Sequence, residues 1–184
     1  YDVGEHNEMR LHGADWNDAL DMAWEKGESV AFTCAYAGNL KDIADCLKHM
    51  EEKTGISKIE MAEEMKCLLA EGTELYESPD RKQKLLDEYT SLCEHNVKGG
   101  MILVSTEQIR KNLVESAGDD MGWFNGYYDN HGNAVEYSKK DEVRMMLTGQ
   151  VFAVMSKTAG EEQVKEICRS ADKFLFDQKA GGYR

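Results

Sequence analysis

The sequence predicts an all-α fold that carries one small β-hairpin. Three observations lead to this prediction. Apolar residues recur at helical spacing in successive stretches of the 184-residue chain, and proline occurs only once, at Pro79. One aromatic stretch, residues 122–137, instead surrounds a motif that is typical of tight turns. Roughly six helices joined by short loops favour pairs of antiparallel neighbours.

The first expected helix follows Ser29 and ends near Met50. Its apolar residues have the i, i+3, i+4 spacing of a buried helix face. They are Val30, Cys34, Ala37, Leu40, Ile43, Ala44 and Leu47. Ser29 precedes this stripe and has the hydroxyl group that suits a helix N-cap. We therefore expect Ser29 to cap a long helix.

Further helices are expected at residues 59–76, 79–95, 106–117, 141–157 and 160–176. Ser57 and Glu60 have the spacing of a capping box at the start of the first of these. Ser78 and Pro79 open the next one, because proline is tolerated in the first turn of a helix.

The expected hairpin lies in GWFNGYYDNHGNAVEY, residues 122–137. Its turn is predicted at residues 129–133, where Asp, Asn and Gly cluster. The preceding aromatic residues are Trp123, Phe124, Tyr127 and Tyr128. They either pack the hairpin onto the helices or form a platform on which a sugar ring stacks.

The composition limits the classes of partner. The chain has 41% hydrophobic and 31% charged residues, which is typical of a globular protein, and its net charge is −13. This charge argues against a nucleic-acid partner and against an anionic membrane surface. The five cysteines form no C-x-x-C pair, so we expect buried free thiols, no metal site and a reducing cytoplasm.

An acidic cluster with an indole inside it is the main candidate for chemistry. In GADWNDALD, residues 13–21, the carboxyl groups of Asp15, Asp18 and Asp21 recur every third residue around Trp16. Like charges in a partly desolvated cleft raise one another's pKa, and a carboxyl group that is protonated near neutral pH can protonate a departing glycosidic oxygen. The alternative is an acidic turn before a helix, since carboxylates favour helix N-termini.

Several motifs together resemble the catalytic segment of glycoside hydrolase family 94. They are GEHN at 4–7, GADWND at 13–18, KGESV at 26–30, WFNGYYDN at 123–130, TGQVFAVMS at 148–156 and GGYR at 181–184. That family holds inverting phosphorylases of cellobiose, chitobiose, cellodextrins and β-1,2-oligoglucans, with a related domain in cyclic β-1,2-glucan synthases. The sequences of these motifs are most similar to the β-1,2-oligoglucan phosphorylase branch of the family.

The resemblance implies a fold and a set of site residues. The fold is an (α/α)6 toroid of the six-hairpin glycosidase type, of which residues 1–184 would form part, as a partial catalytic domain of a longer enzyme. Asp18 matches the family's general acid, and Trp16 matches the tryptophan that lines the sugar site. Asp15 and Asn17 would shape the loop and hydrogen-bond to the sugar or to Asp18.

The implied reaction is phosphorolysis of a β-linked glucooligosaccharide, a hexosyl transfer. Asp18 would protonate the glycosidic oxygen while inorganic phosphate attacks the anomeric carbon from the opposite face, which gives α-glucose 1-phosphate. Phosphate is then a co-substrate, and no cofactor is expected. The phosphate site is expected beyond Arg184, and Thr148 and Gly149 are expected to pack rather than to bind phosphate.

Two other functions stay open. An inverting hydrolase on the same toroid would need a second carboxylate about 6.5–9.5 Å from Asp18, for which Glu5 or Glu28 could serve. An inactive carbohydrate-binding or structural fragment would keep the aromatic residues without turnover. His6 and His12 either contact sugar hydroxyls or are structural, and Glu28 either supports Asp18 or caps its own helix. The oligomeric state is left open, a homodimer included.

Overall fold

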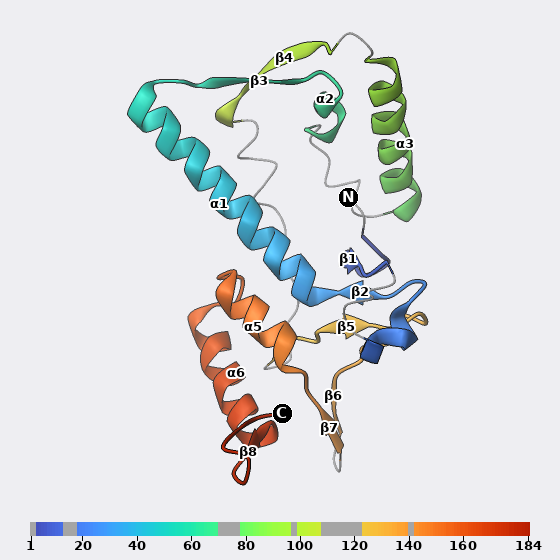
Figure 1. Cartoon of the computed structure of the whole chain (residues 1–184), viewed down its shortest axis with the longest axis vertical. Coiled ribbons are helices and arrows are strands. Elements are labelled where there is room, and N and C mark those ends of the chain that lie inside the picture. The colour runs from blue at the N-terminus through green and yellow to red at the C-terminus, as the bar shows by residue number, and fades with distance from the viewer. Residues whose placement is uncertain (1–2, 13–17, 70–77, 97–98, 108–122, 140–141) are drawn as a thin grey trace. The chain divides into compact units, whose positions relative to one another are not determined.

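A computed structural model of the chain describes residues 3–12, 18–69, 78–96, 99–107, 123–139 and 142–184. Contacts between residues divide it into two compact units. The middle unit comprises Asn39–Ser116 together with Tyr1, and the terminal unit comprises Asp2–Gly38 and Ala117–Arg184. Each unit is described by itself below, with the elements labelled in Figure 1.

Helix α1, Val30–Thr54, matches the first expected helix. Its N-terminus is capped as predicted, because the Ser29 hydroxyl oxygen accepts the backbone N–H of Phe32 at 3.1 Å. The Thr33 hydroxyl donates to the Ser29 carbonyl oxygen at 2.9 Å and reinforces the first turn. The helix continues four residues past the expected end at Met50.

The middle unit contains strands β3, Lys58–Ala62, and β4, Met101–Ser105, and helices α2, Met65–Leu68, and α3, Pro79–His95. The two strands pair antiparallel, with Ile59 opposite Val104. Ile59, Met61, Ile102 and Val104 pack with Leu47 and Leu69 into one small core. Helix α3 begins at Pro79 as expected.

The helix expected at residues 59–76 is wrong at its start. Residues 58–62 read Lys-Ile-Glu-Met-Ala, in which polar and apolar side chains alternate before the final alanine. Alternation of this kind suits a strand with one buried face. Pairing with β4 buries Ile59 and Met61 on that face, so a strand forms and only α2 remains helical before residue 70.

The terminal unit is built around a three-stranded antiparallel sheet in the order β1–β2–β5. Its strands are β1, Met9–Arg10, β2, Glu28–Ser29, and β5, Tyr127–Tyr128. The short 3-10 helix η1, Asp18–Ala23, lies between β1 and β2 in the chain. A bridge between Tyr128 and Ala134 closes the turn after β5, so the hairpin expected near residues 122–137 is confirmed.

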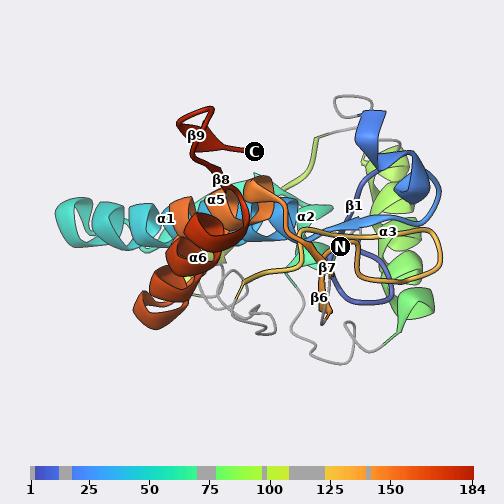
Figure 2. The ribbon, with the colours of Figure 1, turned by 90° about the horizontal axis from the view of Figure 1, so that it is seen from below.

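The rest of the terminal unit comprises β6, Tyr137–Lys139, β7, Glu142–Arg144, α5, Leu147–Met155, and α6, Glu161–Phe174. Strands β8, Phe176–Asp177, and β9, Gly182–Tyr183, form a small ladder that follows α6 (Figure 2). The helix expected at residues 160–176 is confirmed within two residues. The helix expected at 141–157 begins late, because Glu142–Arg144 pairs with β6 instead.

The predicted fold class is therefore wrong. Among the described residues, small antiparallel sheets stand beside the helices in both units, so the fold is mixed α and β rather than all-α or part of an (α/α)6 toroid. Most of the missed strands span two or three residues, too few to display a period of two in the sequence. Of the helix expected at residues 106–117, only Thr106 and Glu107 lie within the described residues.

All five cysteines are free thiols, but their burial differs from the prediction. Cys34 is buried and Cys67 is half-buried, whereas Cys46, Cys93 and Cys168 are exposed. Among the described residues, no cluster of His, Cys, Asp and Glu has an arrangement suited to a metal ion. Within the same residues, no helix combines the length and the apolar character needed to cross a membrane.

Candidate active site

The predicted general acid, Asp18, is the first residue of η1. The structure places its backbone only. Trp16, Asp15 and Asn17, the other predicted site residues, lie outside the described residues. What the structure does describe is the frame that holds η1.

One side of this frame is the connection from η1 to β2. Ala23, the last residue of η1, is 1% exposed. Its carbonyl oxygen accepts the N–H of Gly27 at 2.9 Å, and Gly27 in turn accepts the N–H of Leu11 at 3.0 Å. A Cβ atom on Gly27 would lie 2.2 Å from the Ala23 carbonyl oxygen, so only glycine allows this approach.

The other side is the turn at residues 129–133. The Asn130 N–H donates to the Met22 carbonyl oxygen at 2.9 Å. The Asn130 side-chain oxygen accepts the N–H groups of Glu25 at 2.8 Å and Lys26 at 2.7 Å. Three hydrogen bonds thus connect the turn to the last part of η1 and the residues after it.

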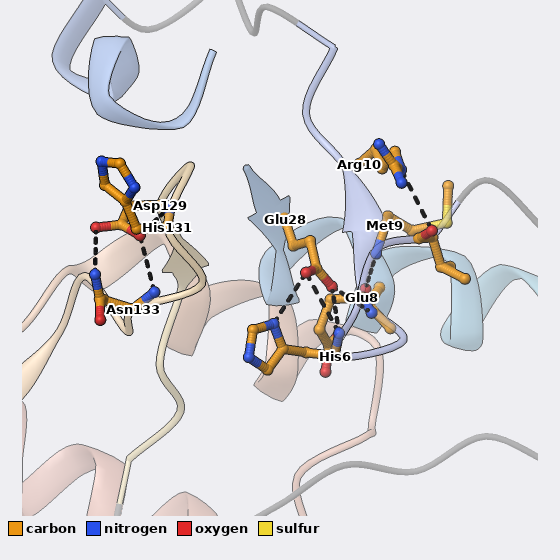
Figure 3. Close-up of polar contacts among 10 residues, drawn as sticks. His6, Glu8, Met9, Arg10, Glu28, Asp129, His131 and Asn133 are labelled. Carbon is orange, nitrogen blue, oxygen red and sulfur yellow. Dashed lines mark hydrogen bonds and ion pairs between the residues drawn. The ribbon is translucent and has the colours of Figure 1, made fainter. Parts of the chain in front are cut away.

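The turn is itself rigid. Asp129 Oδ1 accepts the backbone N–H groups of His131 and Asn133, each at 2.8 Å (Figure 3). The hydrogen bond from the Asn133 backbone, more than any other contact, lowers the pKa of Asp129 below its ordinary value. Gly132 has φ of +76°, a conformation that suits glycine. The turn that was predicted from residue types is therefore also a support for η1.

Glu28 is the centre of a second cluster, on β2. It is 2% exposed, and its Oε2 atom accepts the backbone N–H groups of His6 and Glu8, each at 3.1 Å. The His6 ring Nδ1 lies 2.9 Å from Oε1 of the same carboxylate (Figure 3). A Cβ atom on Gly4 would lie 2.2 Å from the Glu28 carboxyl carbon. Glu28 therefore organises the GEHN segment, while Ser29 caps helix α1.

The His6 ring is held on its face and at its edge. It stacks on the Tyr128 ring of β5 with centroids 3.8 Å apart and an interplanar angle of 7°. A Cβ atom placed on Gly132 would lie 3.4 Å from His6 Cε1, so the ring also lies beside the turn that supports η1. His12, by contrast, is exposed and has φ of +47°, and Glu5 is exposed.

Glu8 adds a second acid beside Glu28. Burial raises its pKa above the ordinary value, the nearby Glu28 carboxylate adds to that rise, and a hydrogen bond with Thr33 opposes it. Its Oε2 atom is buried and has no hydrogen-bond partner among the described residues. Burial and the like charge of Glu28 thus both disfavour the ionised form of Glu8.

Glu136 is a buried carboxylate that the sequence analysis missed. It is 1% exposed, Oε1 accepts the Gly126 N–H at 2.7 Å, and Oε2 accepts the Met146 N–H at 3.0 Å. Burial raises the pKa of Glu136 to about 7, although the two N–H groups and Arg144 oppose this rise. In the sequence it opens the charged stretch EYSKKDE and looks like a solvated residue.

The aromatic stretch packs rather than forming an exposed platform. Phe124 is 7% exposed and Tyr127 is fully buried. Trp123 contacts the Phe174 ring edge-on at a centroid distance of 5.7 Å. Gly149 in α5 also packs closely. A Cβ atom on Gly149 would lie 3.0 Å from the Gly126 Cα atom, so the expected packing role of Gly149 is confirmed.

Comparison with known proteins adds one relative. Over 176 residues the chain is 24% identical to a solabiose phosphorylase of Paenibacillus borealis. The match covers 95% of this chain but 17% of that protein, so the chain spans about a sixth of the relative's length. No protein-family model matches the sequence. The chain is therefore distantly similar to a phosphorylase along almost all of its length.

Proposed function

We propose that this chain is the acid-bearing part of the catalytic domain of an inverting glycoside phosphorylase of the glycoside hydrolase family 94 type, within a longer enzyme. The observation that carries the proposal is the similarity to a solabiose phosphorylase over 95% of the chain. The D-W-N-D motif lies inside this span and leads into η1. The proposal concerns phosphorylase activity on a β-linked glucooligosaccharide.

The proposed reaction is a single displacement. Asp18 donates its proton to the glycosidic oxygen as the bond from that oxygen to the anomeric carbon breaks. A phosphate oxygen attacks the same carbon from the opposite face, which inverts its configuration and gives α-glucose 1-phosphate. Trp16 stacks on the sugar, and Asp15 and Asn17 hydrogen-bond to the sugar or to Asp18. Phosphate is the co-substrate, and the chemistry requires no cofactor.

The contacts around η1 support this role. A general acid must be held within about half an ångström of its productive position. Helix η1 is supported at one end by the contact of Gly27 with Ala23. Asn130 adds three hydrogen bonds, because its N–H donates to the Met22 carbonyl oxygen and its side-chain oxygen accepts the N–H groups of Glu25 and Lys26. Such a frame suits an acid whose geometry is fixed before substrate binds.

The environments of Glu28 and Glu136 disfavour both as the base of an inverting hydrolase. An inverting hydrolase needs a carboxylate that is free to activate water. The oxygens of Glu28 and Glu136 already accept hydrogen bonds from backbone N–H groups. Five free thiols also suit the reducing cytoplasm, where we propose that the enzyme acts.

The test is phosphate-dependent release of glucose 1-phosphate by the full-length protein that contains this chain. Substrates are sophorose, longer β-1,2-glucans, cellobiose and solabiose, each with and without phosphate. Product that requires phosphate, is lost in Asp18→Asn and persists in Asp21→Asn supports the proposal. The second variant removes an equivalent carboxylate from the same short helix.

Two other outcomes contradict the proposal. Free glucose released without phosphate indicates an inverting hydrolase. The protein is an inactive carbohydrate-binding remnant if it is folded, yields no product in either buffer and binds these sugars, with equal affinity in the wild type and in Asp18→Asn.

A further inference from the structure

The contact of the His6 ring with Glu28 fixes which ring nitrogen faces the carboxylate. The Glu28 carboxylate acts as an acceptor, because its Oε2 atom accepts the backbone N–H groups of His6 and Glu8. The ring nitrogen Nδ1, 2.9 Å from Oε1, is therefore the donor in this pair. In a neutral imidazole the proton on Nδ1 leaves a lone pair on Nε2. His6 consequently presents an acceptor at Nε2.

The ring cannot easily turn away from this arrangement. Its face is stacked on Tyr128 at 3.8 Å, and its Cε1 edge lies beside Gly132. The carboxylate that holds Nδ1 is itself buried and bonded to two backbone groups. A side chain fixed in this way loses little conformational entropy when a ligand binds to it.

Nε2 remains available to a ligand. The His6 side chain is 34% exposed, whereas the Glu28 side chain is 3% exposed. In the part of the chain that the structure describes, Nε2 has no hydrogen-bond partner. A carboxylate that holds one ring nitrogen fixes the orientation of the other, as it does for metal-binding and catalytic histidines.

The position of the ring connects it to the predicted acid. His6 lies beside Gly132, and the same turn donates the Asn130 N–H to the Met22 carbonyl oxygen of η1 at 2.9 Å. Asp18 begins that helix. The ring and η1 therefore contact one rigid five-residue turn, and both belong to the terminal unit.

We propose that His6 Nε2 accepts a hydrogen bond from a hydroxyl group of the carbohydrate whose glycosidic bond Asp18 protonates. The inference rests on the proposed function and adds a substrate-binding residue to that site. A sugar hydroxyl can donate to a lone pair, whereas inorganic phosphate near neutral pH is an anion that presents mainly acceptor oxygens. A neutral ring that donates its Nδ1–H to Glu28 therefore suits a sugar hydroxyl better than a phosphate anion.

The experiment measures sugar binding separately from turnover. Sophorose and a longer β-1,2-glucan are titrated calorimetrically into the full-length Asp18→Asn protein, alone and combined with His6→Asn or His6→Gln. Asparagine keeps an N–H near the Nδ1 position but removes Nε2, whereas glutamine extends an amide oxygen toward the Nε2 position. His131→Asn, an exposed histidine of the neighbouring turn, is the matched control.

The expected result is a loss of sugar affinity that is specific to Nε2. His6→Asn should raise the Kd for the sugar roughly fivefold to tenfold, the cost of one neutral hydrogen bond, and leave the KM for phosphate of the otherwise wild-type enzyme unchanged. His6→Gln should recover most of the affinity. A similar melting temperature for both variants shows that the loss is not one of folding.

Other outcomes overturn the inference, and they are distinguishable from failure of the proposed function. Unchanged sugar affinity in His6→Asn contradicts the contact between His6 and the sugar, even if the wild-type enzyme makes glucose 1-phosphate. A substitution that raises only the KM for phosphate contradicts it as well. Absence of sugar binding overturns it as well. If the protein yields no product but His6→Asn still weakens sugar binding, the contact between His6 and the sugar is supported and the phosphorylase activity is rejected.

Discussion

Gly126 donates its backbone N–H to Oε1 of the buried Glu136 at 2.7 Å. The residue directly before β5 is thereby joined to the residue directly before β6. The second carboxylate oxygen accepts the N–H of Met146, which precedes α5. A Cβ atom on Gly126 would lie 2.6 Å from Oε1, so the carboxylate occupies the space that any side chain would need.

Gly126→Ala should therefore destabilise the protein. The new methyl group must displace a buried carboxylate that two backbone N–H groups hold in place, and we expect a loss of about 1–3 kcal/mol in the free energy of unfolding. Urea denaturation measures it. Gly182→Ala is the matched control, because Gly182 has no atom within 4 Å of the position of a Cβ and should change stability little. Equal effects of both substitutions would contradict the packing argument.

Glu136 should also make stability depend on pH. Burial raises its pKa from 4.5 to about 7, so the folded state retains a proton that the unfolded state releases. The stabilisation is fully present below pH 4.5 and is lost as the pH rises to 7, by at most about 3 kcal/mol. Unfolding free energies between pH 4.5 and pH 8 measure this slope.

Glu136→Gln separates the pH dependence of stability that Glu136 causes from the pH dependence that other groups cause. The variant has no proton to lose, so the difference between its stability and that of the wild type should shrink as the pH rises from 4.5 to 7. Glu52→Gln removes one surface carboxylate instead, and its difference from the wild type should stay nearly constant over that range. A constant difference for Glu136→Gln would reject the role assigned to this carboxyl group.

Gly4 and Glu28 should show energetic coupling. A Cβ atom on Gly4 would lie 2.2 Å from the Glu28 carboxyl carbon, and Glu28 is fixed by hydrogen bonds to the GEHN segment. Gly4→Ala should cost about 2 kcal/mol or more of unfolding free energy in the wild type. In a Glu28→Ala background the clash is absent, so the same substitution should cost much less. Additive effects in this double-mutant cycle would contradict the contact.

Ser29 and Ser78 precede α1 and α3, the two longest helices among the described residues, and should respond differently to removal of the hydroxyl group. The Ser29 hydroxyl oxygen accepts the Phe32 N–H at 3.1 Å, whereas Ser78 makes no side-chain cap bond within the described residues. Ser29→Ala should cost about 1 kcal/mol and speed hydrogen exchange of the Phe32 amide. Ser78→Ala should have a much smaller effect. Comparable losses would show that burial of Ser29, rather than its cap, sets the cost.

Particular residues explain why some elements could be predicted from the sequence and others could not. Helix α1 was predictable, because its cap and its apolar stripe are both local in sequence. Strand β3 was not, because Ile59 and Met61 suit a helix face as well as a strand face until Ile102 and Val104 pair with them. Long-range pairing of this kind overrides local preference.

The candidate site divides in the same way. The turn at residues 129–133 followed from its residue types, and its local hydrogen bonds confirm it. Glu28 and Glu136 are charged residues that are buried because backbone N–H groups distant in sequence donate to them. No local pattern in the sequence therefore indicated their burial. Asp18, Trp16, Asp15 and Asn17 stay predictions about side chains outside the described residues.

Asn130 provides the test of how η1 is supported. Its side-chain oxygen accepts the N–H groups of Glu25 and Lys26, and Asn130→Ala removes that acceptor. If η1 positions the acid, kcat/KM for phosphorolysis should fall about tenfold, because small displacements of a catalytic group are costly. Asn130→Asp keeps an oxygen acceptor and should retain most of the activity.

The matched control is Asn133→Ala, which removes a side-chain contact to Asp129 at 3.2 Å inside the same turn but none to η1. It should lower kcat/KM much less than Asn130→Ala. Equal losses would mean that the turn acts through its own stability. Wild-type activity in Asn130→Ala would mean that η1 is held well enough by the backbone bond from residue 130 to Met22 and by the contact of Gly27 with Ala23. Steady-state rates measured at saturating phosphate distinguish these results.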